Sequence, residues 1–179
     1  MYPPGHIGLT AGLFAPVVYW LRVTGRDRTA RDCLSVGVVL SVLPDADAVV
    51  PGLVHRGVTH TLLAAVVAGV VIALALRRTG VAPVGLRAEH AATHYLVGAS
   101  GVVSHLLGDV ITPMGIQPLY PLWGTPVTFD VVSAGSPAAN TALLLTGTLA
   151  LACAYSAPAG LSRTEGEESC VSPAPPTRR

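Results

Sequence analysis

Residues 104–113 read SHLLGDVITP and close a run of about twenty mostly apolar residues, which is long enough to span a bilayer. The run carries two ionisable side chains, His105 and Asp109, four positions apart and therefore on one face of a helix. Ionisable groups inside a spanning helix are costly, so by default they indicate function. Histidine and carboxylate at this spacing commonly ligate a divalent metal. The alternative is a polar pair that neighbouring helices satisfy.

The composition indicates a polytopic membrane protein rather than a soluble domain. The chain has 179 residues and a mean hydropathy of +0.58, and 12% of its residues are charged, about half the usual share in globular domains. The formal net charge of +1 gives no indication of a nucleic-acid partner. The three cysteines lack metal-binding spacing, so we expect neither a disulfide framework nor a zinc knuckle.

Five apolar runs predict five helices, over about residues 7–21, 32–43, 60–76, 90–111 and 138–155. Pro44 ends or breaks the second helix, and Thr59 is a candidate cap for the third. The proline-rich segment 112–137 predicts a loop whose aromatic residues suit a membrane interface. The predicted fold is an all-α transmembrane bundle of four to five helices over residues 1–157. A disordered cytoplasmic tail, rich in Ser, Pro and Glu, follows at 158–179.

The arginines predict the topology. Of the eleven basic residues, all arginine, ten lie in the linkers after the first and third helices and in the tail, which share one side of a five-helix bundle. Only Arg56 falls on the other side. By the positive-inside rule the arginine-rich side is cytoplasmic. We therefore predict a multi-pass plasma or inner membrane protein with its N-terminus outside and its C-terminus in the cytoplasm.

The unusual polar residues gather at the outer end of the predicted bundle. They come from the ends of four helices and are His6, Asp45, Asp47, His55, Arg56, His60, His105 and Asp109. Apolar runs flank the two acids of LPDAD at 43–47, which favours metal ligation over a solvated helix end. His60 starts an apolar helix and is a stronger ligand candidate than the loop residue His55. His94 is expected at the inner interface, about 16 Å from His105, too far to share a metal.

Four strings resemble the YdjM family of membrane-bound, predicted metal-dependent hydrolases. They are GH at 5–6, LPDAD at 43–47, HRGVTHT at 55–61 and SHLLGDVITPMGIQPLYP at 104–121, and their order and spacing match the family. Family members commonly read LPDxDH, whereas Ala48 replaces the last histidine here, so one possible ligand is missing. The family is similar in motif style to zinc-dependent phospholipase C and P1-type nucleases, whose His/Asp clusters cleave phosphodiesters.

The resemblance implies a metal site and a hydrolytic function. The positions matching the family's motifs, which would ligate one or two divalent ions, are His6, Asp45, Asp47, His55, His60, His105 and Asp109. Zinc is favoured by the mixture of histidine and aspartate. Such ions lower the pKa of water for attack on a phosphoester or other ester, with Asp47 as base or bridging ligand and Arg56 as the contact for an anionic substrate. The depth of the site indicates a lipid or membrane-adjacent substrate in contact with the bilayer.

Two other classes of protein remain open from the sequence. A non-enzymatic membrane protein could use the cluster only to hold its helices together, in a closed, four-coordinate site. A small transporter would need the polar face of the 90–111 helix to continue across the membrane. His94, Gly98 and Gly101 leave that reading open, although leucines and valines fill the rest of the helix.

Overall fold

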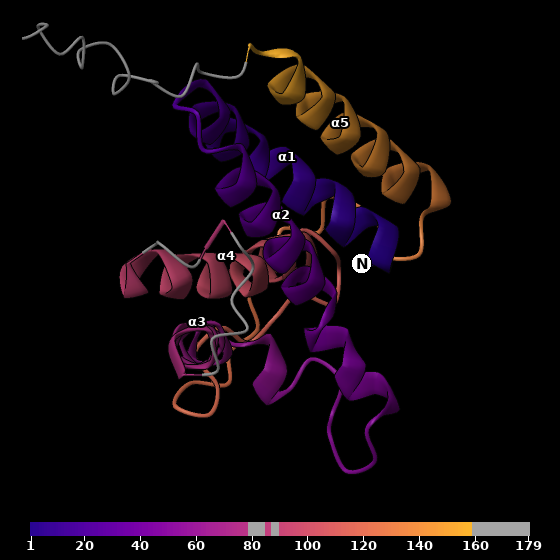
Figure 1. The fold of residues 1–179 in the computed structure, drawn as a ribbon. Helices are drawn as coiled ribbons and strands as arrows, with labels where there is room; N and C mark the ends of the chain where they lie inside the picture. The colour runs from indigo at the N-terminus through magenta and orange to yellow at the C-terminus, as the bar shows by residue number, and fades with distance from the viewer. Residues whose placement is uncertain (79–84, 87–89, 159–179) are drawn as a thin grey trace, which may run out of the picture.

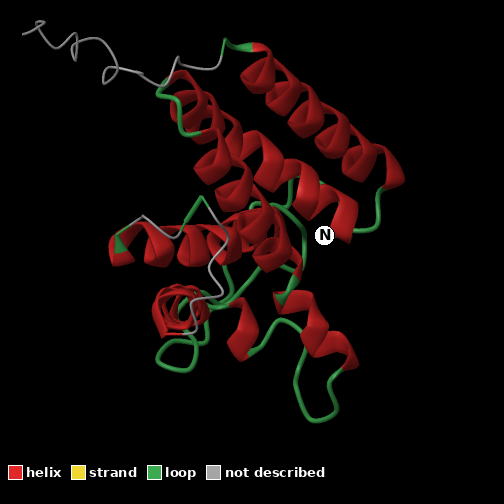
Figure 2. Ribbon diagram, viewed as in Figure 1, coloured by secondary structure: helices red, strands yellow, loops and turns green. Residues whose placement is uncertain are grey.

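The computed structural model describes residues 1–78, 85–86 and 90–158, which fold into helices joined by loops. The α-helices are α1 (Pro3–Val23), α2 (Asp27–Val42), α3 (Leu62–Arg78), α4 (Ala91–Val110) and α5 (Pro137–Ser156) (Figure 1). Two short 3₁₀ helices, η1 (Pro44–Val49) and η2 (Val58–His60), follow α2. The described part contains no strand (Figure 2), so the predicted all-α class is confirmed.

The predicted helices correspond to α1–α5, with the largest difference at the start of α2. The sequence predicts that start near Asp32, whereas α2 begins at Asp27. The prediction followed the apolar run, but the first turns of α2 are amphipathic instead. Thr29 and Ala30 are buried, and Arg22 Nε lies 3.2 Å from a carboxylate oxygen of Asp27. A polar sequence is helical here because one of its faces packs on the core.

Helix α1 lies at the centre of the fold. Helix α5 runs beside it, and α2 packs against another of its sides (Figure 1). Helix α4 packs on α2, and α3 packs on α4. One apolar cluster, around Val18, Cys33 and Val97, lies where α1, α2 and α4 meet. A second cluster, around Leu40 and Val102, lies nearer the end of α2, and it supports the end of the bundle where the polar motifs occur.

Two of the described helices, α1 and α5, are long and apolar enough to cross a membrane, by length and composition. Helix α3 also exposes apolar side chains, including Leu63, Val67 and Leu74. Exposed apolar surface of this kind is typical of an interaction with lipid or with another protein. The described helices are therefore consistent with a membrane-type bundle. The predicted tail at 158–179 lies outside the described residues, apart from Pro158.

The segment between α4 and α5 folds back across one end of the bundle. The amide of Phe129 donates a hydrogen bond to the carbonyl of Val110, at the end of α4, with a length of 2.8 Å. The amide of Leu62, at the start of α3, donates to the carbonyl of Pro118 at 2.9 Å. This segment is therefore tied to both α3 and α4, next to the polar motifs.

Helices α1 and α5 approach closely where two glycines face each other. A β-carbon on Gly147 would overlap the backbone of Gly8, and a β-carbon on Gly8 would overlap the backbone of Leu143. Small residues at such contacts are typical of helices that associate in membranes. Gly12, one turn further along α1, has more room, because a β-carbon there would lie 3.7 Å from the Cα of Gly147, an ordinary contact.

We expect Gly147→Ala to destabilise the protein by about 1–3 kcal/mol, because the added methyl group pushes α5 away from α1. Gly12→Ala is the matched control, since its methyl group fits and alanine gains up to about 1 kcal/mol in helix propensity. Thermal unfolding of both variants in detergent, followed by circular dichroism, measures the difference. Equal unfolding temperatures for the two variants would contradict the close packing of α1 on α5.

Candidate metal centre

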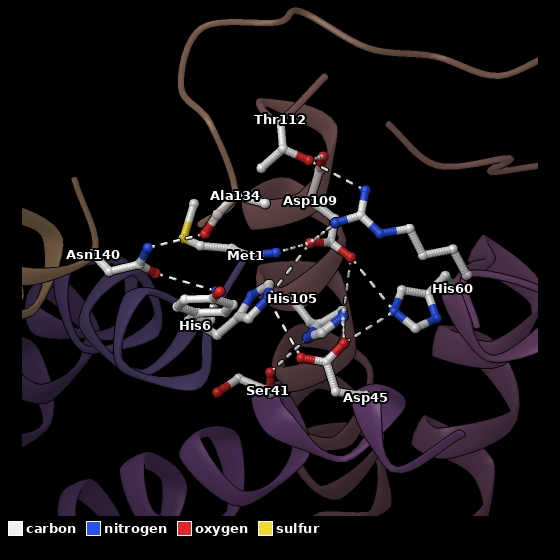
Figure 3. A network of polar contacts seen from close by, with 12 residues as sticks. Met1, His6, Ser41, Asp45, His60, His105, Asp109, Thr112, Ala134 and Asn140 are labelled. Carbon is white, nitrogen blue, oxygen red and sulfur yellow. Dashed lines mark hydrogen bonds and ion pairs between the residues drawn. The ribbon is translucent and has the colours of Figure 1, made fainter. Parts of the chain in front are cut away.

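Polar side chains from several helix ends meet at one end of the bundle (Figure 3). His6 comes from the start of α1, Asp45 from η1, and both His105 and Asp109 from the end of α4. One possible ligand atom from each of these four residues lies within 4.8 Å of the others. A second group with the same spacing shares one carboxylate with the first and consists of Asp45, His55 and His60. We call these six residues the His/Asp cluster; of the seven predicted ligands, only Asp47 falls outside it.

Local breaks in the helices allow these side chains to converge. Pro44 opens η1 directly after α2, and because proline lacks an amide proton the α-helical bonding pattern stops there. Gly108 in α4 leaves room for His6, since a β-carbon at this position would come within 2.7 Å of the His6 Nδ1 atom. The rings of His6 and His105 consequently stack, with centroids 3.9 Å apart and planes 15° apart.

The tautomer of His105 follows from its surroundings. Its Nδ1 lies 2.7 Å from the carbonyl oxygen of Ser41, which can only accept, so Nδ1 carries the proton. In the neutral ring, the Nε2 lone pair then faces the carboxylates of Asp45 and Asp109 at 3.6 and 3.4 Å. A lone pair that faces two carboxylates is electrostatically unfavourable unless a cation or a proton lies between them.

His60 is oriented in the same way as His105, except that its Nδ1 contacts a hydroxyl group instead of a carbonyl. Thr59 donates its hydroxyl proton to Asp47 at 2.5 Å, so the hydroxyl oxygen can accept from His60 Nδ1 at 2.9 Å. The Nε2 atom of His60 then faces Asp45 and Asp109, each at 3.4 Å. His60 and His105 therefore direct their lone pairs at the same two carboxylates.

Several buried atoms of the cluster lack the hydrogen bonds that they need. Within the described part of the chain, no partner is found for His6 Nδ1 and Nε2, His105 Nε2 or Asp109 Oδ2, and all three side chains are fully buried. Buried polar atoms in proteins are normally paired. Imidazole nitrogen and carboxylate oxygen are ligand types that zinc and similar divalent ions prefer. The donor set therefore fits a divalent metal ion.

Asp47 lies beside the cluster and contacts two of its histidines, His55 and His60, on their Nδ1 side. Its carboxylate accepts hydrogen bonds from His55 Nδ1 at 2.7 Å and from Thr59 at 2.5 Å. Burial alone would raise the pKa of Asp47, but the two hydrogen bonds and the nearby imidazoles of His60 and His55 together lower the pKa below its ordinary value. Asp47 is thus an ionised acceptor, while its predicted roles as ligand and base stay predictions.

Arg56 places a positive charge against Asp109. Its Nη2 donates to Asp109 Oδ1 at 2.9 Å, and its Nη1 donates to Thr112 Oγ1 at 3.1 Å and to the carbonyl of Gly115 at 2.8 Å. The α-amino group of Met1 donates to the same Oδ1 at 2.5 Å. Arg56 has a φ of 62°, a left-handed conformation that is costly for a residue with a side chain. Its contacts hold the loop in this conformation, and its predicted contact with an anionic substrate stays a prediction.

A cavity of about 450 Å³ opens beside the cluster. Its walls come from the loop that precedes η2 and from the segment after α4, and they include His55, Arg56, Gln117 and Tyr120. Its volume falls within the range of small-molecule sites, about 300–1,000 Å³. The cavity adjoins the cluster through His55 and Arg56, so a bound molecule would reach the cluster from this side.

The predicted cap of α3 is wrong. The sequence predicts Thr59 as the cap of α3, but α3 begins at Leu62, so Thr61 accepts from the amide of Ala64 at 3.0 Å instead. The sequence also predicts His94 at the inner interface, and its position relative to a membrane stays a prediction. Within the bundle His94 is buried, and its Nε2 lies 2.8 Å from the backbone carbonyl of Leu86.

The sequence analysis did not predict two groups that shape the cluster, the Ser41 carbonyl and Gly108. Ser41 acts through its backbone carbonyl, which no side-chain pattern reveals. Gly108 acts by having no side chain, and its place between two predicted ligands in SHLLGD was the available signal. Thr59 offered a signal as well, since it lies next to His60 in the motif HRGVTH, but its role beside Asp47 depends on how the loop folds.

The fold and the cluster define a helical, membrane-type protein with a candidate metal site. The family model described as YdjM inner membrane protein matches residues 1–166, so this chain belongs to that family. Neither a curated protein nor a solved structure matches the chain. The family assignment supports an inner membrane location and contact with the lipid bilayer.

We expect Arg56 and Asp109 to be energetically coupled. Arg56→Gln removes one charge partner from a buried carboxylate and should cost about 3 kcal/mol, whereas the same change beside Asp109→Asn should cost less. A double-mutant cycle should give a coupling energy of about 0.5–3 kcal/mol. Chemical unfolding of the four proteins in detergent with a chelator present measures this energy without a contribution from metal. Additive effects of the two substitutions would contradict the ion pair.

Proposed function

We propose that this chain is a membrane-bound, metal-dependent hydrolase that acts on a phosphoester or other ester at the outer face of the membrane. The observation that carries this proposal is the convergence of the His60 and His105 Nε2 lone pairs on the carboxylates of Asp45 and Asp109 (Figure 3). Membership of the YdjM inner membrane family supports the location. The donor set supports the metal, and the resemblance of the motifs to predicted metal-dependent hydrolases supports the hydrolytic reaction.

The spacing within the cluster supports a zinc-like ion. Two ligands of a tetrahedral zinc lie about 3.3 Å apart, given bond lengths of about 2.0–2.1 Å. The Nε2 atoms of His60 and His105 lie 3.4–3.6 Å from the oxygens of Asp45 and Asp109. His6 Nε2 lies 3.5 Å from Asp109 Oδ1 and completes this set. Asp45 belongs to both groups of the cluster, which supports it, rather than Asp47, as the bridging carboxylate of a two-ion site.

A divalent ion held by the cluster would supply Lewis acidity and would lower the pKa of a water molecule. Other groups of the chain orient the ligating histidines. Asp47 fixes His60 through Thr59, and the Ser41 carbonyl fixes His105, as hydrogen-bonded partners behind ligands commonly do. His55 is 41% exposed, borders the cavity and donates from Nδ1 to Asp47, so its Nε2 is the atom left to ligate a second ion.

The cavity beside His55 and Arg56 is the proposed entry for the substrate. Tyr120 lines it, and Trp123, in the same loop, is exposed, which suits a position at the membrane interface. A lipid or another membrane-adjacent phosphoester would reach the cluster from there. The arginine distribution supports a multi-pass arrangement with this end of the bundle outside and the C-terminus in the cytoplasm.

We expect His60→Ala and His105→Ala to lose bound metal and hydrolysis together. The wild-type protein should contain at least one divalent ion per chain and hydrolyse a generic phosphodiester such as bis(4-nitrophenyl) phosphate. His90→Ala is the matched control, because His90 is exposed at the far end of α4 and should keep both properties. Elemental analysis of the purified proteins gives the metal content, and absorbance gives the rate.

Three outcomes separate this proposal from its alternatives. Wild-type protein that holds metal but turns over no ester, with variants that lose both metal and folded structure, would support a structural cluster. Wild-type protein without metal would overturn the metal site itself. Metal-dependent movement of a solute across vesicle membranes, without hydrolysis, would favour the small transporter.

We expect Asp47→Asn to weaken metal binding without abolishing it. In the proposed site Asp47 acts on the Nδ1 side of His60, away from the ligating Nε2. Loss of such a hydrogen-bonded partner typically costs 10–100-fold in metal affinity. Thr59→Val breaks the same connection and should give a similar loss, whereas Asp45→Asn removes a ligand and should lose more. Competition with a chelating dye measures the three affinities. An Asp47→Asn protein that binds no metal would mean that Asp47 is itself a ligand.

A further inference from the structure

A second cavity, of about 840 Å³, lies between α1, α2 and α4, apart from the His/Asp cluster. Its apolar lining includes Leu13 and Val17 from α1 and Leu96, Val103 and Leu107 from α4. All of these side chains except Val103 are at least 44% exposed, so they form an open groove on the surface of the bundle rather than a closed core. No residue of the cluster lines it, and the proposed hydrolysis makes no use of it.

The groove has the length of a lipid chain. Its lining on α4 extends from Thr93 to Leu107, which is about 21 Å at a rise of 1.5 Å per residue. The hydrocarbon core of a bilayer is about 30 Å thick, so the chains of one leaflet occupy about 15 Å. A groove of this length therefore accommodates one acyl chain along the helix axis.

The basic side chains of the groove lie at one end of it. Arg26, Thr29, His90 and Thr93 line it there, and the Arg26 guanidinium lies 5.8 Å from the centre of the Trp20 ring, which is also part of the lining. By the arginine distribution this end faces the cytoplasm. Anionic lipids on that face of a membrane attract basic residues, and tryptophan is typical of the headgroup level.

We infer that this groove binds an anionic phospholipid of the cytoplasmic leaflet. One acyl chain lies between α1 and α4, and the phosphate group lies against Arg26 with His90 and Thr93 nearby. The inference rests on the membrane location and on the predicted topology, and it does not depend on hydrolysis at the cluster. A bound lipid of this kind completes the packing between α1 and α4 along their exposed sides.

Quenching of Trp20 by brominated lipids tests this site. In a Trp123→Phe background Trp20 is the single tryptophan, and the protein is reconstituted in phosphatidylcholine vesicles with increasing fractions of chain-brominated phosphatidylglycerol or phosphatidylcholine. We expect quenching by brominated phosphatidylglycerol to saturate, with an apparent affinity about fivefold above that of phosphatidylcholine, as expected for one basic residue at an anionic headgroup. Arg26→Gln should remove this preference, whereas Arg31→Gln, an exposed arginine outside the groove, should keep it.

A second variant and a second measurement keep the test decisive if Arg26→Gln fails to fold. Ser100→Phe fills the groove from α4 without changing charge and should reduce saturable quenching by both lipids. Native mass spectrometry of wild-type protein should show one retained anionic phospholipid. Quenching that rises in proportion to either lipid, an equal effect of Arg26→Gln and Arg31→Gln, or wild-type protein without a retained lipid would each overturn the site.

Discussion

The arrangement of this end of the bundle depends on two carboxylates that face imidazole nitrogens in a buried space. Asp45 and Asp109 lie within 3.4–3.8 Å of the Nε2 atoms of three histidines. Arg56 and the α-amino group of Met1 both contact one oxygen of Asp109, and the other oxygen has no partner among the described residues. Buried charge is costly unless it is paired, so a cation or extra protons between the carboxylates and the imidazole nitrogens would stabilise this geometry.

The break after α2 serves the cluster in two ways. It brings Asp45 inward on η1, and it leaves the carbonyls of the last turn of α2 without helical partners. One of those carbonyls belongs to Ser41 and accepts the Nδ1 proton of His105. The break at Pro44 therefore has two effects. It places Asp45 in the cluster on one side, and on the other side it leaves the Ser41 carbonyl free of helical bonding so that it orients His105.

The sequence could predict the helices and the gathering of His6, Asp45, His105 and Asp109, because each motif lies at a helix end and the topology brings alternate ends together. It could not predict which hydroxyl caps α3, because Thr59 and Thr61 both precede an apolar run and only the start of α3 at Leu62 decides between them. The sequence also could not predict that the Ser41 carbonyl orients His105 or that Asp47 accepts a hydrogen bond from Thr59. These contacts depend on the direction of a carbonyl and on the path of a loop.

Helix α5 contributes no side chain to the cluster, yet it sets the axial register of α1. The amide of Tyr2 donates to Asn140 of α5 at 3.2 Å, and Gly8 lies against Gly147 without space for a methyl group. His6 lies between these two attachment points. A shift of α1 by one residue, about 1.5 Å along its axis, would remove the ring from the space above Gly108. The height of His6 over α4 is therefore determined by a helix on the opposite side of α1, more than 130 residues further along the chain.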